Sequence, residues 1–287
     1  MEKAIVTGSG GLLGGKLLES LEEYYNCVGV SKSGANGLQA DVSTGRMKEI
    51  IVGEKPEIIF HTAAISDVDY CELNPKQAWD VNVTGTRNVL EGAGRAGAKV
   101  IHISTDFVFD GKKGMYKEDD RPNPVNYYGK TKLEAEKLVK ESGLVYIIAR
   151  PSVIYGGGQK KKFLGWVLES LEAGKTITVV DDHYNTPTLV DNLAEMLIAL
   201  RDEHGIFHTS GAERISRYDF AVKIARTFEL DETLLTPIKT EELRQAAKRP
   251  KDTSLDTGKI RAKGIRPLGV DEGLSRIKNK GFKSINE

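Results

Sequence analysis

The sequence predicts an α/β protein: a doubly wound parallel sheet of the Rossmann type, with a smaller C-terminal substrate-binding lobe. Three observations carry this prediction. Short apolar runs of strand length alternate with longer amphipathic patterns, a glycine-rich turn directly follows the first run, and the alternation loosens after residue 150. Short apolar strands between helices indicate a parallel sheet covered on both faces, and right-handed crossovers then wind it in both directions.

The elements are expected in a definite order along the chain. Strands lie at 4–7, 27–30, 58–61, 100–103 and 145–149, with helices at 11–23, 75–96 and 128–141. A further strand is expected at 176–180. A helix is expected at 191–201, where the chain returns to the first sheet, and another at 216–228, with Ser216 as its N-cap. We therefore predict a dinucleotide-binding domain over 1–150, joined by some later segments, and a mainly substrate-binding lobe over 151–287.

Charge and composition exclude several classes of protein. The 287 residues carry 41 basic and 41 acidic side chains, so no broad electrostatic footprint for nucleic acid is expected. No apolar stretch approaches the roughly 20 residues of a membrane span, and the first residues enter a strand pattern without a signal peptide. Cys27 and Cys71 form no paired motif, so neither a disulfide framework nor a metal site is expected. A cytoplasmic location fits these features best.

A phosphate-binding turn is predicted between the first strand and the first helix. Glycines stand at 8, 11 and 14, where they permit the tight turn, the close approach of a pyrophosphate and the packing of helix on strand. The helix N-terminus offers free N–H groups to the anion. The alternative is a tight strand–helix turn without a ligand. The residues assigned to this part of the cofactor site are Gly8, Gly11, Leu12, Leu13 and Gly14.

The end of the second strand predicts which cofactor binds. An acidic residue there would favour NAD, whereas Ser31 and Lys32 suit the 2′-phosphate of NADP(H), so NADP(H) is preferred over NAD(H). The alternative for Lys32 is a solvated loop lysine. Asp41 and Val42, after a short third strand, are expected to contact the adenine. The small residues Ala63 and Ala64, after the strand at 58–61, complete the assigned cofactor site.

The residues that carry the chemistry follow a later strand and begin a helix. Tyr128 and Lys132 stand at positions i and i+4, on one helix face. A tyrosine can protonate a developing alkoxide if a nearby cation lowers its pKa, and Lys132 is that cation and could also hold the nicotinamide ribose. Thr105, at the end of the strand at 100–103, is expected to bind the substrate oxygen. For Ser104 we prefer a hydrogen bond with local backbone.

These residues together resemble the extended short-chain dehydrogenase/reductase family and, within it, the dTDP-4-dehydrorhamnose reductases. The resemblance covers nearly the whole chain and is carried by four segments, at 104–111, 124–132, 179–188 and 249–256. It implies a Thr105–Tyr128–Lys132 triad and the NADPH-dependent reduction of the 4-keto group of a dTDP-sugar. Related dehydratases place a glutamate base where this chain has Phe107, which favours simple reduction.

The resemblance also implies a set of residues at the substrate. They are Asp106, Phe107, Val153, Asn185 and Arg249. Two of them depart from the family pattern, because Val153 stands where a tryptophan is typical and Asn185 where a glycine is common. The lysines at 160–162 are expected to form a solvated loop, the weaker alternative being attraction of a substrate pyrophosphate.

Two alternative functions remain open. The first is another nucleotide-sugar enzyme, either a 4-epimerase or a reductase of a different keto-sugar. The second is a non-catalytic NADP-binding partner, because the regulatory subunit of methionine adenosyltransferase resembles the same reductases. Since homodimers are the commonest soluble oligomers, a homodimer is expected as well.

Overall fold

The computed structural model describes residues 1–156 and 162–281 and contains the predicted Rossmann sheet. Seven parallel strands follow the order β11-β6-β5-β4-β1-β2-β3. They are β1 (Lys3–Thr7), β2 (Asn26–Ser31), β3 (Leu38–Gln39), β4 (Ile58–His61), β5 (Lys99–Ile103), β6 (Tyr146–Arg150) and β11 (Gly205–His208). The strand order reverses between β1 and β4, which is where such folds open a ligand crevice.

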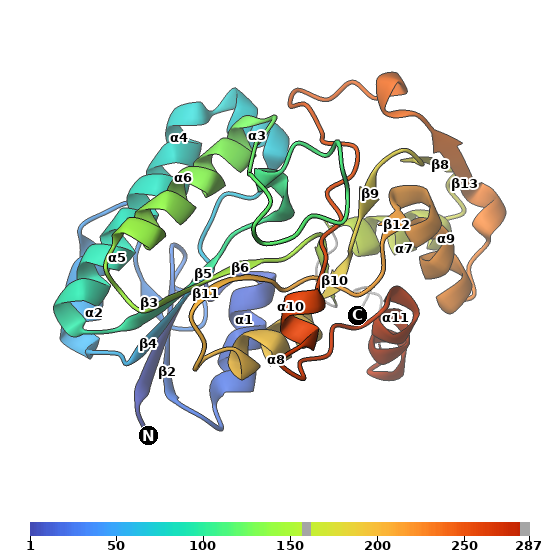
Figure 1. Cartoon of the computed structure of the whole chain (residues 1–287). Coiled ribbons are helices and arrows are strands. Elements are labelled where there is room, and N and C mark those ends of the chain that lie inside the picture. The colour runs from blue at the N-terminus through green and yellow to red at the C-terminus, as the bar shows by residue number, and fades with distance from the viewer. Residues whose placement is uncertain (157–161, 282–287) are drawn as a thin grey trace.

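Helices cover both faces of this sheet (Figure 1). One face carries α1 (Leu12–Leu21) and α8 (Val190–Ala199), which pack on Val6, Phe60 and Ile101. The other carries α2 (Arg46–Glu54), α5 (Gly85–Ala96) and α6 (Tyr127–Glu141), which pack on Ile5, Ile59 and Val100. Alternate strand residues therefore point into two separate cores, as a sheet buried on both faces requires.

The second lobe has a core of its own, built around Leu168, Phe220 and Leu274. Its helices are α7 (Phe163–Glu172), α9 (Arg217–Thr227) and α11 (Val270–Asn279). Its strands pair in twos: β7 (Ile154–Tyr155) with β10 (Thr188–Leu189), β8 (Ile177–Val180) with β13 (Leu235–Ile238), and β9 (Tyr184–Asn185) with β12 (Ile215–Ser216). The predicted cap is present, because the Ser216 hydroxyl accepts a hydrogen bond from the Asp219 N–H at 2.9 Å.

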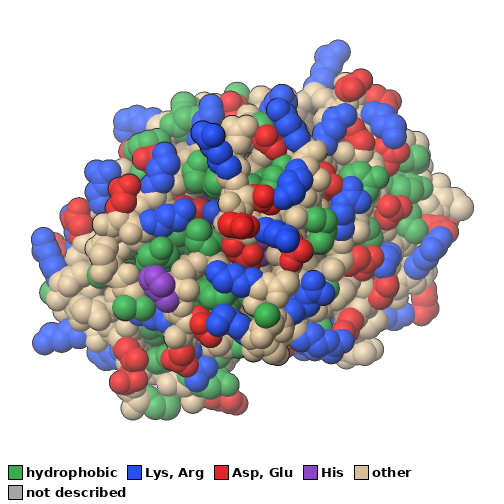
Figure 2. Space-filling model, in the orientation of Figure 1, with side chains coloured by type: hydrophobic (Ala, Val, Ile, Leu, Met, Phe, Trp, Pro, Cys, Tyr) green, Lys and Arg blue, Asp and Glu red, His purple; other side chains and the backbone are tan. Residues whose placement is uncertain are grey.

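Short helical turns complete the described chain. They are α3 (Val68–Leu73), α4 (Pro75–Trp79), α10 (Gly258–Arg261), a π-helical turn η1 (Asp80–Thr84), and the 3₁₀ turns η2 (Asp106–Val108), η3 (Glu232–Leu234) and η4 (Thr240–Glu242). None of the described helices is long and apolar enough to cross a membrane. On the face shown in Figure 2, basic and acidic side chains alternate over the surface, in agreement with the zero net charge.

The helix expected at 75–96 is present over these residues. It runs without a break through α4, η1 and α5, and the five residues of η1 are π-helical, which the sequence analysis did not predict. Asn82 is a buried residue of η1. Its side chain accepts from the Ile65 N–H at 2.8 Å and donates to the Ile65 carbonyl at 3.1 Å and to Thr131 at 3.0 Å. The wider turn brings this amide to the loop after β4, in keeping with the frequent use of π-turns near functional sites.

The seventh strand, β11, was not anticipated. It is only four residues long and begins at Gly205, so no alternating pattern marks it in the sequence. It pairs in parallel with β6 at the edge of the sheet, after α8 has packed against α1 on the first lobe. The chain thus crosses between the lobes more than once, and the division at residue 150 stays a prediction.

Candidate functional site

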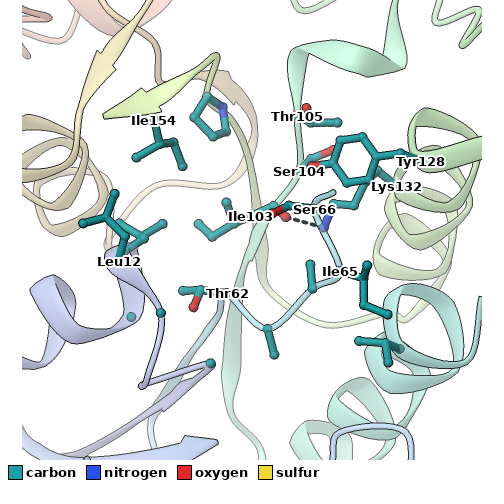
Figure 3. Close-up of a pocket in the computed structure, with 18 of the residues that line it drawn as sticks. Leu12, Thr62, Ile65, Ser66, Ile103, Ser104, Thr105, Tyr128, Lys132 and Ile154 are labelled. Carbon is teal, nitrogen blue, oxygen red and sulfur yellow. Dashed lines mark hydrogen bonds between the residues drawn. The ribbon is translucent and has the colours of Figure 1, made fainter. Parts of the chain in front are cut away.

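A cavity of about 650 Å³ opens at the carboxyl ends of β1, β2, β4 and β5, between the two lobes (Figure 3). In this close-up Thr105, Ser104, Tyr128 and Lys132 lie on one side, and Leu12 and Ile154 on the other. Thr105 lines this cavity, and so do all thirteen residues that the sequence analysis assigned to the cofactor. Two of the thirteen, Tyr128 and Lys132, are also assigned to catalysis. The thirteen are Gly8, Gly11, Leu12, Leu13, Gly14, Ser31, Lys32, Asp41, Val42, Ala63, Ala64, Tyr128 and Lys132.

The glycine turn after β1 brings uncovered backbone to the wall of the cavity. A Cβ at Gly14 would stand 2.2 Å from the Gly8 carbonyl oxygen, so α1 can begin this close to β1 only without a side chain there. Gly8 itself has a φ of 72°, in the left-handed region. No side chain caps α1 at Gly11, so the first N–H groups and the positive end of the helix dipole remain available to an anion. The backbone of this turn could therefore hold an anionic group.

Next to the end of β2 the cavity is lined by a cation, Lys32, and a carboxylate, Asp41. The exposed Lys32 lies 2.9 Å from the Asp41 carboxylate. Partial burial opposes ionisation of Asp41, but hydrogen bonds from Ser43 and Lys32 outweigh it and lower the pKa of this carboxyl. The Ser31 hydroxyl donates to the Ala35 carbonyl at 2.9 Å, which fixes the loop after β2. To reach a phosphate, Lys32 would only have to break its ion pair with Asp41. Because this pair is exposed, breaking it requires little free energy.

The loop after β4 forms the floor of the cavity and was only partly anticipated. Besides Ala63 and Ala64 it contributes Thr62, Ile65 and Ser66. Asn82 holds this loop through both hydrogen-bonding groups of the Ile65 backbone, as described for the π-helical turn. No periodic signal marks Asn82, because it lies within an otherwise ordinary helical pattern.

Thr105 and Tyr128 meet where β5 ends and α6 begins. Thr105 caps the η2 turn, its hydroxyl accepting from the Phe107 N–H at 3.2 Å. The expectation that Lys132 lowers the pKa of Tyr128 is wrong for this structure. Burial raises the pKa of the Tyr128 phenol, and the effect that opposes this shift is a hydrogen bond with Thr105. The Phe107 ring stands edge-on to Tyr128, with the centroids 6.1 Å apart. The phenol is therefore held protonated beside a hydroxyl that can share a substrate oxygen with it.

Lys132 lies one helical turn after Tyr128 and is almost completely buried. Its ammonium group donates to the Ile103 carbonyl at 2.6 Å, the contact drawn as a dashed line in Figure 3. Burial lowers the pKa of Lys132 to about 8, although the negative charge of Glu136 opposes the shift. At neutral pH the side chain is thus mostly protonated, but it loses its proton at a lower pH than an ordinary lysine does.

The prediction that Ser104 hydrogen-bonds to local backbone is wrong. Its hydroxyl donates to the Glu136 carboxylate at 2.6 Å rather than to nearby backbone. Both groups are buried, so the end of β5 is tied to the helix that carries Tyr128 and Lys132. The sequence could not reveal this contact, because 32 positions separate the two residues.

Three of the five residues assigned to the substrate line the cavity, namely Asp106, Phe107 and Val153. The Asp106 carboxylate accepts hydrogen bonds from Thr105 at 3.1 Å, from Ser152 at 2.8 Å and from Thr253. Burial raises the pKa of Asp106, and these hydrogen bonds only partly offset the shift. Asp106 thus joins β5 to the C-terminal stretch. Val153 has a φ of 41°, an unusual backbone conformation for a β-branched residue.

The structure does not bring Asn185 or Arg249 to this cavity. Asn185 is buried and donates to the Thr253 hydroxyl at 2.9 Å. The Arg249 guanidinium binds the Asp69 carboxylate in a fork, at 2.8 and 3.1 Å, and lines a second cavity. Both side chains therefore have partners within the protein, which their sequence context did not indicate.

The C-terminal lobe contributes two residues, Phe163 and Arg217, that the sequence analysis did not assign to the site. Lys162, from the lysine run at 160–162, is exposed and also lines the cavity. The other two lysines of the 160–162 run lie outside the described residues. Among the side chains that the structure describes, no group of three or more histidines, cysteines and carboxylates could hold a metal ion.

Comparisons with known proteins show the family of this chain. The family model for the RmlD substrate binding domain matches residues 2–280. A dTDP-4-dehydrorhamnose reductase of Aggregatibacter actinomycetemcomitans is 33% identical, over 97% of this chain and 99% of that protein. Methionine adenosyltransferase 2 subunit beta of Bos taurus is 32% identical, over 95% of this chain and 87% of its own length.

A solved structure resembles the whole chain. It is a dTDP-4-dehydrorhamnose reductase from Bacillus anthracis in complex with NADP, with a TM-score of 0.91 and 32% identity. The match covers 97% of this chain and 99% of the other. The overall fold of this chain is thus also found in that reductase.

Proposed function

Because this chain belongs to the family of the RmlD substrate binding domain, we propose that it is an NADPH-dependent reductase of the 4-keto group of a dTDP-sugar, of the dTDP-4-dehydrorhamnose reductase type. A single observation carries the proposal: Thr105, Tyr128 and a buried, charged Lys132 line the same cavity as the glycine turn. Proton donor and cofactor site therefore share one enclosed space, as a hydride transfer requires.

The donor set of the cavity fits a nicotinamide dinucleotide phosphate. The glycine turn and the N-terminus of α1 would hold the diphosphate, and Lys32 the 2′-phosphate. When bound, the cofactor supplies the hydride that reduces the substrate carbonyl. The similar reductase solved with NADP supports this assignment, and the preference for NADP(H) over NAD(H) is part of the proposal.

The protein's own residues handle the proton. Thr105 would donate a hydrogen bond to the substrate carbonyl oxygen and align it with the Tyr128 phenol. As the carbonyl carbon gains a hydride, its π-bond breaks and the oxygen becomes basic. Tyr128 gives its proton to that oxygen, and the charge of Lys132 stabilises the phenolate left behind. Phe107, next to this site, has no group that accepts a proton, which favours reduction over dehydration.

A second candidate is an NADP-binding regulatory role. It is favoured by the 32% identity to the beta subunit of methionine adenosyltransferase 2 over most of both chains. The expected homodimer and cytoplasmic location also stay predictions.

A paired assay separates the two candidates. Wild type, Tyr128→Phe and the neighbouring control Tyr127→Phe would receive dTDP-4-keto-6-deoxy-L-mannose, with NADPH or NADH oxidation followed by absorbance. We expect oxidation of NADPH by wild type and Tyr127→Phe, and a loss of about 100-fold or more in Tyr128→Phe, the usual contribution of a general acid. No turnover by wild type despite NADPH binding would refute the reductase proposal and favour the regulatory role.

A further inference from the structure

We propose that Asp106 is a positioning residue for Thr105. Its carboxylate holds the Thr105 hydroxyl in place in the free protein, and hydrogen bonds from elsewhere keep that carboxylate satisfied when the hydroxyl proton turns to the substrate. The inference rests on the proposed function, because it takes Thr105 to bind the carbonyl oxygen of the substrate. It extends the site to Thr253 and Asn185, neither of which is among the described residues that line the main cavity.

The Thr105 hydroxyl is engaged on several sides where η2 begins. Its oxygen accepts a hydrogen bond from the Phe107 N–H at 3.2 Å, and its proton is donated to Oδ1 of Asp106 at 3.1 Å. The Tyr128 phenol is also in hydrogen-bond contact with it. A hydroxyl group carries a single proton, so Thr105 can donate to the substrate only if that proton turns away from Asp106. Asp106 therefore fixes the oxygen of Thr105 and competes with the substrate for its proton.

Two further hydroxyl groups bind the other oxygen of Asp106. Ser152 donates to Oδ2 at 2.8 Å, and Thr253 donates to the same atom. All three side chains are almost completely buried, so these hydrogen bonds replace the water that the carboxylate has lost. The bond from Thr105 is the longest of the three that Asp106 accepts. When the Thr105 proton turns to a substrate, Oδ2 thus keeps both of its donors.

Arg217 of the second lobe also favours the ionised form of Asp106. Burial raises the pKa of Asp106, and the three hydrogen bonds, together with the charge of Arg217, act against that shift. Conversely, burial lowers the pKa of Arg217, and the charge of Asp106 acts against that shift. Since Arg217 begins α9, part of what holds this carboxylate at the end of β5 comes from the second lobe. The position of the reactive hydroxyl therefore depends on how the two lobes pack.

Asn185, in β9, orients Thr253 in turn. Its amide nitrogen donates to the Thr253 hydroxyl at 2.9 Å. An amide nitrogen donates and does not accept, so the Thr253 oxygen is the acceptor here and its own proton is left for Asp106. The Thr253 N–H donates to the Tyr184 carbonyl at 3.0 Å, which fixes its backbone to the same strand. The donors thus run in one direction, from Asn185 through Thr253 to Asp106.

A double-mutant cycle tests whether Thr253 acts through Thr105. The kcat and KM for the keto-sugar with NADPH would be measured in wild type, Thr253→Val, Thr105→Val and the double variant. We expect Thr253→Val to lower kcat by about tenfold, as for a hydrogen bond to a charged group, with KM within about twofold. In the Thr105→Val background the same change should lower kcat by less than about twofold, because the group it acts on is gone. Equal losses in the two backgrounds would overturn the inference.

Further variants separate positioning from folding. Thr253→Ser keeps the hydroxyl and should restore the wild-type kcat, and a kcat as low as in Thr253→Val would contradict the inference. Thr233→Val removes a hydroxyl that donates to Asp231 at 2.6 Å on the surface, and it should leave kcat unchanged. If Thr253→Val does not fold, Ser152→Ala removes the other donor to Oδ2, and the same cycle with Thr105→Val decides.

The hydroxyl protons give a readout that does not need turnover. In threonine-labelled protein, the NMR signals of the Thr105 and Thr253 hydroxyl protons should persist in water because both groups are buried, whereas the exposed Thr233 proton should exchange rapidly. Asp106→Asn should shift both signals, and the control Asp231→Asn neither. A Thr105 proton that exchanges as rapidly as that of Thr233 would overturn the inference, even in a protein that reduces the keto-sugar. A wild type that shows these signals but no turnover would refute the reductase proposal and leave the arrangement around Asp106 standing.

Discussion

Glu136 and Arg150 form a forked ion pair in the interior of the protein, behind Lys132. The Arg150 Nε and terminal nitrogen donate to the two Glu136 oxygens at 2.8 and 2.7 Å, and the exposed fractions of the two side chains are 1% and 0%. Ser104 adds a third donor to the same carboxylate at 2.6 Å. A single carboxylate on α6 thus connects the ends of β5 and β6, and its charge also helps to keep Lys132 protonated.

Removing the charge of Glu136 should destabilise the fold strongly. Glu136→Gln leaves the buried guanidinium of Arg150 without a counterion, so we expect the free energy of unfolding to fall by about 3–5 kcal/mol. Denaturant unfolding measures this loss. The control is Glu134→Gln, which breaks an exposed ion pair with Lys137 on the same helix and should cost about 1 kcal/mol or less. Equal losses in the two variants would contradict the assigned role of the buried pair.

The activity should decline in alkaline solution as Lys132 loses its proton. Burial places the pKa of Lys132 at about 8. Its positive charge is present below that pH and lost above it, so kcat/KM should be flat at lower pH and fall as the pH rises through about 8. A pH–rate profile measures the decline. Lys130→Met, which changes an exposed lysine on the same helix, should keep the profile, and Lys132→Met should lose most activity. A profile that is flat to pH 10 would refute the assignment.

An alanine at Gly14 should abolish the phosphate-binding turn, whereas one at Gly15 should not. The Cβ of Gly14→Ala would stand 2.2 Å from a backbone oxygen, but that of Gly15→Ala would stand 3.6 Å from its nearest neighbour, an ordinary contact. We expect Gly14→Ala to lose NADPH binding and several degrees of melting temperature. Fluorescence titration with NADPH and thermal unfolding test this. Similar behaviour of the two variants would mean that the turn tolerates a side chain.

Lys32 should determine the preference between the two cofactors. Lys32→Ala removes the cation next to the expected 2′-phosphate, so the KM for NADPH should rise by about tenfold and that for NADH should stay constant. Steady-state kinetics with each cofactor measure the ratio. Lys76→Ala, at an exposed lysine paired with Asp80, is the matched control. An unchanged KM for NADPH would favour the alternative that Lys32 is a solvated loop lysine.

The sequence by itself determined the parts of this protein that depend on local order along the chain. Strand and helix periodicity, the glycine spacing after β1 and the i, i+4 spacing of Tyr128 and Lys132 are local patterns. The periodicity predicted the elements in their places, and the residues picked out by the two spacings line one cavity. Parallel strands bring their carboxyl ends to one edge of a sheet, so Thr105 could be placed beside Tyr128 without coordinates.

The tertiary structure decided whatever depends on contacts between distant segments. Asn82 hydrogen-bonds to the backbone of Ile65 from the π-helical turn η1, and the Ser104 hydroxyl donates to Glu136 rather than to backbone. Arg249 and Arg217 look alike in the sequence, yet Arg249 forms an ion pair with Asp69, whereas Arg217 lines the main cavity and is attracted electrostatically to Asp106. The packing of the two lobes decides which carboxylate each arginine meets, and no local pattern records that packing.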